Sequence, residues 1–465
     1  MTFEWAVRGV ALALGVAVAA ILTRYLGPER FGDLSLGFLL VTIAQSAADF
    51  GFKQIAVREA SVRPDERDRI AGTYVMLRGS VGVALFAIVA AVGLLLARDG
   101  TTRLTVVIVA STLLLGFFSS AGFMLHVRLR NELFASTILL QSIVWLGVVA
   151  AASLLGLSLP ALALGFLGMT GLHVAVTFVL ARRLVPFEYH LDRRWLRRLL
   201  KLSAPLAVAG VFAALLSKVD AVIVYSLAGA EAGGMYAASY RIYEQLQIVP
   251  AAVITLIAPL LASWQAVDRA RLRRSFERIG RYLMVAGLAA GVGVALVAEP
   301  LAVLLFGEQF RDAGPLLAVM SVAFVFQAVS YLAGATLVAV GRTRAFAAIL
   351  AVALAADMGL VFALVPHYGA LAAAWVLLGT RAFNAVVMYA YLNRHFQLRL
   401  SVGFTWRLLP PLAVLAAVAL ALRDTSSVLA LAIAVLGYAT ACLLTGALRP
   451  SDLRSLLARE EVARI

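Results

Sequence analysis

The chain of 465 residues is poor in the groups on which most enzymes depend. It has one cysteine, Cys442, which excludes an intramolecular disulfide and a cysteine-based metal cluster. Its five histidines are scattered without the spacing of metal ligands. The H-E-x-x-H, G-x-x-x-x-G-K-[ST] and G-x-S-x-G motifs of metalloproteases, nucleotide-binding loops and hydrolases are absent. We therefore expect no enzyme, no catalytic or metal-binding residue and no bound cofactor.

Charged residues are also scarce. They make up 14% of the chain, whereas hydrophobic residues make up 63%, and both values lie far from those of soluble proteins. Apolar runs of about 20 residues, long enough to cross a bilayer as helices, recur along the sequence and predict an all-α polytopic membrane protein with about fourteen transmembrane helices. The predicted spans are 3–23, 31–52, 71–97, 104–125, 135–155, 160–181, 202–227, 236–262, 282–305, 314–339, 346–365, 370–392, 408–422 and 428–448.

Basic residues give the chain a net charge of +15, but their distribution argues against a nucleic-acid partner. With the N-terminus placed inside, six of the 40 Lys and Arg fall in outside loops and five within spans, which leaves 29 for the inside loops and the tail. This bias sets the orientation of membrane proteins. We therefore predict a multi-pass protein of an inner-type membrane with both termini in the cytoplasm.

Two patterns occur twice in the chain. Residues 27–32 and 229–234 both read G-x-E-x-x-G, at an offset of 202 residues. A second set recurs at an offset of 212 residues: Leu125, Arg130, Phe134 and Ala135 against Leu337, Arg342, Phe346 and Ala347. The repeats indicate two six-helix lobes in a parallel pseudo-two-fold arrangement. The predicted divisions are 1–201 (N-terminal lobe), 202–392 (C-terminal lobe) and 393–465 (two extra helices and a cytoplasmic tail).

A basic amphipathic stretch precedes the seventh predicted span. Residues 193–201 read R-R-W-L-R-R-L-L-K, a pattern typical of a helix that lies in the membrane interface. Such a helix is either a topological anchor or a regulatory, partner-binding element.

Four segments, in this order, resemble the polysaccharide flippase branch of the multidrug/oligosaccharidyl-lipid/polysaccharide exporter (MOP) superfamily. Residues 24–32 read R-Y-L-G-P-E-R-F-G and resemble the family's turn after the first span. The stretch from Asp220 to Tyr240 resembles the corresponding turn in the second half. Residues 305–310 (L-F-G-E-Q-F) and 337–342 (L-V-A-V-G-R) resemble the ends of the ninth and tenth spans.

The resemblance implies a transporter of lipids rather than an enzyme. Members of this branch move undecaprenyl-diphosphate-linked oligosaccharide from the inner to the outer leaflet by alternating access, for polysaccharide biosynthesis. The implied partners are the lipid-linked oligosaccharide, membrane lipids and, by extension, a polysaccharide polymerase complex. Because no nucleotide site is present, any uphill transport needs a proton or sodium gradient or a coupled downstream process.

A flippase must offer the diphosphate a wet, cationic path, so charges within spans are the candidates. Each costs about 3 kcal/mol at a helix centre and therefore usually faces a cavity or a partner. Arg381 either holds phosphate, with Asn384 one turn away, or pairs with Asp357. Arg241 either binds substrate or pairs with Glu244 three residues on. The remaining cationic candidates for substrate binding are Lys218, Arg78 and Arg8, of which the last two could instead extend to the headgroups.

Three carboxylates are weaker candidates for ion coupling. Asp49, Asp220 and Asp357 lie within predicted spans, where low dielectric favours the neutral form unless a cation pairs with the carboxylate. Each residue is therefore either a proton or sodium site or one half of a structural ion pair.

Other functions remain open from the sequence. A peptidoglycan-precursor flippase or a drug/cation antiporter has the same fold. A cavity for cationic drugs is expected to be lined by acids, and the five cations against four acids in the spans mildly favour an anionic cargo. A multispan glycosyltransferase or polymerase is the third alternative, and the short outside loops argue against it.

Overall fold

The computed structural model describes residues 2–49, 52–127, 131–184, 190–399, 406–421 and 427–446, and these residues form helices and no strand. The chain divides into two compact units. Unit 1 comprises residues 1–238, 305–310 and 350–373, and unit 2 comprises 239–304, 311–349 and 374–465. The lobe boundaries predicted from the sequence repeat stay a prediction. Arg130 of that repeat and the tail beyond residue 446 lie outside the described residues.

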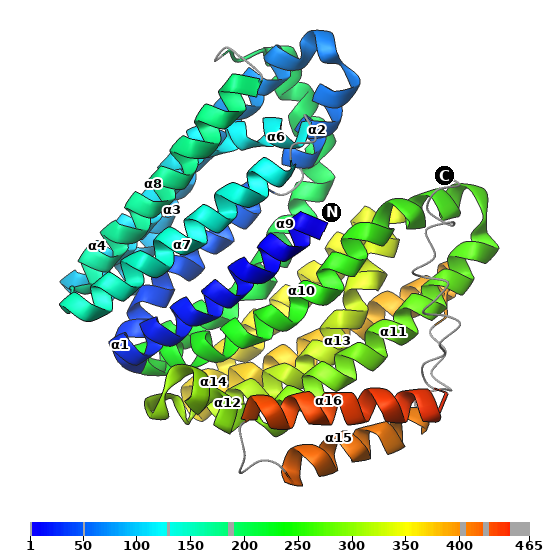
Figure 1. Cartoon of the computed structure of the whole chain (residues 1–465). Coiled ribbons are helices and arrows are strands. Elements are labelled where there is room, and N and C mark those ends of the chain that lie inside the picture. Colours follow the sequence, from blue (N-terminus) through cyan, green and yellow to red (C-terminus); the bar gives the residue numbers. More distant parts are fainter. Residues whose placement is uncertain are drawn as a thin grey trace. The chain divides into compact units, whose positions relative to one another are not determined.

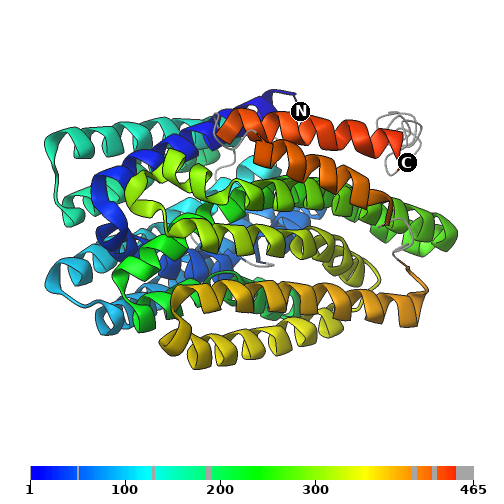
Figure 2. The ribbon, with the colours of Figure 1, turned by 90° about the horizontal axis from the view of Figure 1, so that it is seen from below.

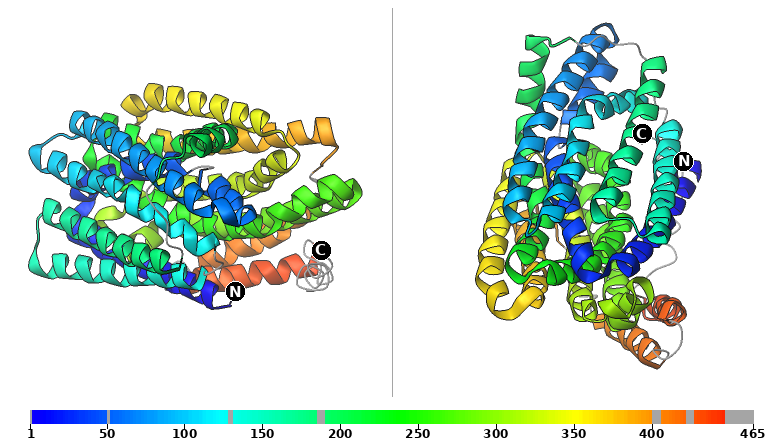
Figure 3. Two further views of the ribbon diagram at one scale, coloured as in Figure 1. Left: turned by 90° about the horizontal axis from the view of Figure 1, so that it is seen from above. Right: turned by 90° about the vertical axis from the view of Figure 1, so that its left-hand side faces the viewer.

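Unit 1 contains the first nine helices of the chain (Figure 1). They are α1 (Thr2–Asp49), α2 (Phe52–Val62), α3 (Arg67–Leu96), α4 (Gly100–Ala110), α5 (Gly116–Ser119), α6 (Phe123–Val127), α7 (Asn131–Leu155), α8 (Leu159–Leu184) and α9 (Arg193–Ala228). Figure 3 shows α7 and α8 side by side, and both also contact α1.

The later helices are α10 (Ala230–Val267), α11 (Arg269–Leu296), α12 (Ala298–Phe306), α13 (Ala313–Ala339), α14 (Thr343–Phe396), α15 (Leu409–Ala421) and α16 (Ser427–Leu444). They belong to unit 2 except for the beginning of α10, the end of α12 and residues 350–373 of α14, which belong to unit 1. Gly291 of α11 allows close packing on α13, because an added Cβ would lie 2.5 Å from the Ser321 carbonyl oxygen. The last two helices, α15 and α16, run side by side (Figure 2).

The two longest helices are each broken at a glycine. Gly27 in α1 has φ 70° and ψ 173° and is followed by Pro28, and Gly369 in α14 has φ 66° and ψ −161°. Glycine adopts positive φ without the steric cost that a side chain imposes. Each long helix is therefore two successive helices, which correspond to the predicted span pairs 3–23 with 31–52 and 346–365 with 370–392.

Ten helices of the described chain are long and apolar enough to cross a membrane, and residues 406–419 and 433–444 form two shorter apolar helices. The chain is therefore a multi-pass membrane protein.

Two predicted spans are not continuous helices. The run 282–305 passes from α11 to α12 at Val297, which has non-helical backbone angles (φ −113°, ψ 20°), and the run 104–125 is more irregular. The run 104–125 is α4, a 3₁₀ segment (η2, Ser111–Leu115), the short α5, a second 3₁₀ segment (η3, Ser120–Gly122) and α6. The hydroxyl groups of Thr112 and Ser120 donate to the carbonyls of Val109 (2.7 Å) and Phe117 (2.9 Å). Such bonds compete with the regular helix ladder and bend helices. Hydroxyl residues and glycines thus make this stretch irregular, although it is apolar enough to read as one span.

The two G-x-E-x-x-G turns pack against each other within unit 1. A Cβ on Gly32 would lie 1.9 Å from the Ala230 carbonyl oxygen, and a Cβ on Gly234 would lie 1.9 Å from the Pro28 carbonyl oxygen. Ala230 and Pro28 occupy the same position in the two motifs, so the contact is reciprocal. The close approach of the two backbones explains why both turns end in glycine.

Residues 305–310, another of the segments that carry the family resemblance, pack beside these two turns. Gln309, in the 3₁₀ segment η4 (Glu308–Phe310), donates to the carbonyls of Thr23 (3.2 Å) and Arg24 (3.3 Å), which lie in the last turn before the break at Gly27. The ring of Phe310 packs edge-on against Phe31 with centroids 6.0 Å apart. The motif at 305–310 therefore caps the first half of α1.

The basic stretch 193–201 is the beginning of α9 rather than a separate helix. Asp192 caps it, because its carboxylate accepts from the backbone N–H of Arg194 at 2.8 Å. Trp195 and Leu199 are buried in a cluster with α2 and α3. The indole N–H of Trp195 donates to Glu66 Oε2 at 2.9 Å. One face of this stretch therefore packs into unit 1.

We expect replacement of Trp195 by alanine to destabilise the protein by about 3–5 kcal/mol, the usual cost of removing a large buried aromatic side chain. The exposed fraction of Trp195 is 1%. Trp195→Phe keeps most of the packing and should cost less. Thermal unfolding in detergent measures the effect, with Trp406→Ala as the control because Trp406 is 65% exposed. Equal melting temperatures for the Trp195→Ala and Trp406→Ala variants would contradict the expectation.

Candidate functional site

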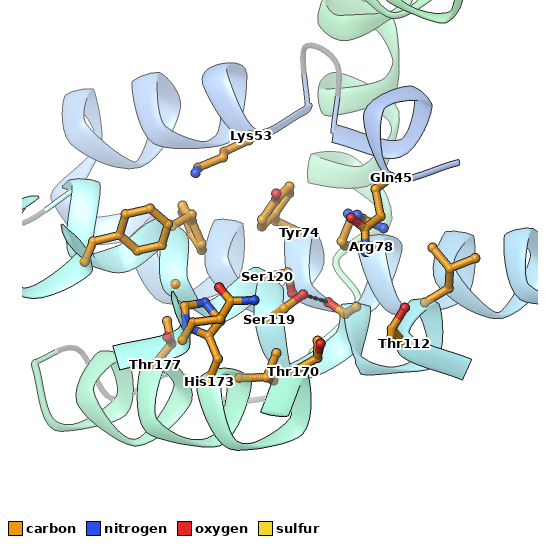
Figure 4. Close-up of a pocket in the computed structure, with 17 residues that line it drawn as sticks. Gln45, Lys53, Tyr74, Arg78, Thr112, Ser119, Ser120, Thr170, His173 and Thr177 are labelled. Carbon is orange, nitrogen blue, oxygen red and sulfur yellow. Dashed lines mark hydrogen bonds between the residues drawn. The ribbon is translucent and has the colours of Figure 1, made fainter. Parts of the chain in front are cut away.

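Unit 1 encloses a polar cavity of about 260 Å³ beside the irregular α4–α6 stretch (Figure 4). Its walls come from α1, α2, α3, η2, α5, η3, α6, α7 and α8. The irregular stretch reaches α3 through glycines, since a Cβ on Gly82 would lie 2.6 Å from the Leu113 carbonyl oxygen. Gly116 also leaves room for a cation, because a Cβ added at this glycine would lie 3.4 Å from a terminal nitrogen of Arg78.

Two cationic side chains line this cavity. Arg78 projects from α3 and is 7% exposed. Lys53 comes from α2, and its Nζ lies 5.2 Å from the ring centroid of Phe134, within cation–π range. Among the described residues that line the cavity, none is a carboxylate. The walls therefore carry positive charge.

Neutral polar groups complete the lining. Two amides, from Gln45 and Gln141, and several hydroxyl groups accompany the cations. His173 of α8 is fixed in orientation, because its Nδ1 lies 3.1 Å from the Thr137 carbonyl oxygen. A carbonyl oxygen only accepts hydrogen bonds, so Nδ1 donates and Nε2 is left as an acceptor. Cations with hydroxyl and amide groups suit an anion that also carries sugar-like hydroxyl groups.

The structure places one of the predicted cations in this cavity. Arg78 lines it, whereas Lys218 (9% exposed) is buried elsewhere on α9. Arg8 and Asp49 belong to α1, but their side chains lie outside the described residues.

Two of the three predicted ion-coupling residues are buried. Asp220 is 0% exposed, accepts a hydrogen bond from the Tyr236 hydroxyl and accepts another from the Ala221 N–H at 2.8 Å. Asp357 is also 0% exposed. An ion-coupling role for either residue, and a pair between Asp357 and Arg381, stay predictions.

Three other predicted residues, Arg381, Asn384 and Arg241, belong to unit 2. Arg381 and Asn384 of α14 are buried, at 5% and 3% exposure. Arg381 and Glu244 both interact electrostatically with Tyr331, whose hydroxyl donates to Gln247 Oε1 at 2.8 Å. Unit 2 thus has a polar cluster of its own, defined here by Arg381, Tyr331, Gln247 and Glu244.

Arg241 of α10 interacts electrostatically with Glu244. This neighbour favours the local-pair interpretation of Arg241, since an opposite charge nearby stabilises a guanidinium that is only partly exposed.

Of the described lining residues, Arg78 alone was a site candidate from the sequence, and Lys53 and His173 are the basic ones that were missed. Lys53 follows the predicted end of the second span by one residue and was assigned to a loop. His173 was dismissed as isolated. A signal was nevertheless present, because Thr170, His173 and Thr177 are spaced three and four residues apart in an otherwise apolar helix and so share one face.

We expect Arg381→Ala and Lys218→Ala to reduce translocation of a prenyl-diphosphate-linked sugar by about tenfold each, the effect of losing about 1.4 kcal/mol of binding, while protein abundance is unchanged. Reconstituted vesicles containing equal amounts of each variant test this. Unchanged rates in both variants would remove the two residues from the substrate path.

Comparisons with known proteins agree with the helical architecture. The solved structure of the lipid II flippase MurJ in an inward closed conformation superposes with a TM-score of 0.77 over 99% of this chain and 100% of that chain, at 13% identity. An inward-facing multidrug resistance MATE family transporter of the MOP superfamily gives a TM-score of 0.68 over 83% of this chain and 94% of that chain, at 14% identity. These structures share the fold of this protein.

Sequence comparisons identify the family. A Shigella flexneri protein named "Putative O-antigen transporter" is 22% identical over 388 residues, which cover 80% of this chain and 92% of that protein. Residues 21–315 match the family described as polysaccharide biosynthesis protein. The chain therefore belongs to the polysaccharide biosynthesis protein family.

Proposed function

We propose that this protein is a flippase that moves an undecaprenyl-diphosphate-linked oligosaccharide from the inner to the outer leaflet by alternating access. The observation that carries the proposal is the cavity of unit 1, where Arg78 and Lys53 meet amide and hydroxyl groups and none of the described lining residues is a carboxylate. The cations hold the diphosphate and the neutral polar groups bind the first sugar, while the prenyl tail stays in lipid.

The proposal includes fourteen spans in two repeated lobes plus two helices. The count of fourteen starts from ten long apolar helices. The breaks at Gly27 and Gly369 divide two of them and add two spans, and the two shorter apolar helices add two more. The reciprocal packing of the two G-x-E-x-x-G turns supports an internal repeat. The excess of basic residues in the inside loops supports cytoplasmic termini in the bacterial inner membrane.

The proposed transport cycle uses no resident cofactor and draws on a proton or sodium gradient, or on consumption of the flipped lipid by a polysaccharide polymerase complex. The sequence repeat and the relatives described as transporters support a carrier rather than an enzyme. The positive charge of the cavity lining favours a dianionic lipid over the cationic drugs of an antiporter.

Transfer in proteoliposomes tests the function. A fluorescent prenyl-diphosphate-linked oligosaccharide is placed in both leaflets, and an impermeant enzyme that attacks the sugar reports the outer fraction. We expect the protected half of the lipid to become accessible in vesicles that contain the protein and to stay protected in empty vesicles. Faster movement of a peptidoglycan precursor or of a cationic drug would support the alternatives, and no movement of any cargo would refute a flippase.

A further inference from the structure

His173 is the one described lining residue of the cavity whose ordinary pKa of about 6.5 places its charge change near neutral pH. Its Nδ1 donates to the Thr137 carbonyl at 3.1 Å, which fixes the neutral tautomer and leaves the lone pair of Nε2 unused by that bond. Figure 4 shows Lys53, Tyr74 and Arg78 across the cavity from His173. The ring is therefore held in a cavity that already contains positive charge.

The charged and titratable groups around His173 come from two helices. Lys53 belongs to α2, and Tyr74 and Arg78 belong to α3. The described lining residues of α1, η2, α5, η3, α6 and α7, and the other lining residues of α8, are neutral. With the cavity empty, both cations oppose a third positive charge. A bound diphosphate reverses the sign of the local field and favours an imidazolium.

We propose that His173 takes up a proton when the anionic head of the cargo enters the cavity, so that cargo binding and protonation of Nε2 are linked. The inference rests on the proposed function, because it needs a diphosphate in this cavity. One proton from solvent binds the Nε2 lone pair, and the Nδ1–H bond to Thr137 stays in place. The Nε2–H group then donates to a phosphate oxygen, and the proton returns to solvent when the lipid leaves. The third positive charge thus exists only while the cargo is bound.

The linkage predicts how binding depends on pH. The free protein holds His173 neutral and the complex holds it protonated, so the complex binds more protons and its affinity increases as pH falls. One linked proton changes the affinity by at most about tenfold for each pH unit. Lysine and arginine side chains ordinarily titrate well above this pH range, so the dependence is expected from the histidine.

The test measures binding of farnesyl-diphosphate-linked N-acetylglucosamine to the full chain in nanodiscs. Both phosphates of this probe are esterified, so its two negative charges stay constant over the range. We expect the dissociation constant to be about tenfold lower at about pH 5.5 than at about pH 8. Calorimetry near neutral pH, in two buffers that differ in protonation enthalpy, should report uptake of up to about one proton.

Two histidine variants test whether the linked proton binds to His173. His173→Gln keeps a polar side chain and should bind with less than about a twofold difference across the same pH range, without proton uptake. His367→Gln is the matched control and should behave as the unmodified protein, because His367 does not line the cavity. Binding without pH dependence in the unmodified protein, or a pH dependence that survives in His173→Gln, would overturn the linkage while leaving the flippase proposal intact. The absence of any probe binding would overturn both.

Discussion

Replacing Arg78 with alanine is expected to lower the translocation of a prenyl-diphosphate-linked oligosaccharide by about 30-fold or more. A charge-assisted contact between a buried guanidinium and phosphate contributes about 2–5 kcal/mol, and each 1.4 kcal/mol corresponds to about a factor of ten. Arg78 is 7% exposed, so little water is available to take over this contact. The same vesicle assay that tests the function measures the loss.

Two variants control for loss of charge and for loss of fold. Arg78→Lys keeps the charge but not the planar fork that matches phosphate, so we expect an intermediate rate. Arg103→Ala removes an exposed arginine that does not line the cavity and should transport normally. A normal rate in Arg78→Ala, with the protein folded, would show that the diphosphate does not depend on this residue.

Replacing Gly234 with alanine is expected to cause a large loss of stability. The added Cβ would lie 1.9 Å from the Pro28 carbonyl oxygen, and it meets backbone that cannot rotate away. The two turns must separate by more than about 1 Å, which breaks the packing on both sides, and overpacking of this kind costs about 3 kcal/mol or more. Thermal unfolding in detergent and the yield of folded protein measure the effect.

The reciprocal geometry gives this experiment a stringent control. Gly32→Ala should be as harmful as Gly234→Ala, and the double variant should cost less than the sum, because both substitutions disrupt one interface. Gly15→Ala in α1 meets nothing within 4 Å and should be neutral or slightly stabilising, since alanine favours helices. If Gly234→Ala unfolded at the same temperature as Gly15→Ala, the turns would not be in contact.

The fold could be predicted from the sequence wherever local chemistry determines it. The glycine breaks at Gly27 and Gly369 fall between runs that were separated because polar residues, glycine and proline interrupt them. The run 104–125 was read as one span, because mean hydropathy does not register the hydroxyl and glycine residues that break its helix. The start of α9 was read as an interfacial helix, because the sequence does not show that Trp195 packs against α2 and α3.

The candidate site was harder to predict. A charged residue within an apolar run can be recognised in the sequence alone, and Arg78 was found in that way. Lys53 and His173 are combined with it only by tertiary packing of α2, α3 and α8. The partner of Asp220, the Tyr236 hydroxyl, lies on another helix. The repeated glycine turns were found as a pattern, but their contact with each other depends on how the chain folds back.

Site-specific photo-crosslinking tests most directly whether the cargo head occupies the cavity of unit 1. A photoreactive amino acid replaces Gln45, which lines the cavity, or Leu95, which is 84% exposed and does not line it. We expect a radiolabelled prenyl-diphosphate sugar to crosslink at position 45 and not at position 95, with the signal reduced by unlabelled lipid and by Arg78→Ala. Labelling at position 95 that equals or exceeds labelling at position 45 would place the cargo elsewhere. Labelling at position 45 that Arg78→Ala leaves unchanged would show that Arg78 does not hold the cargo head.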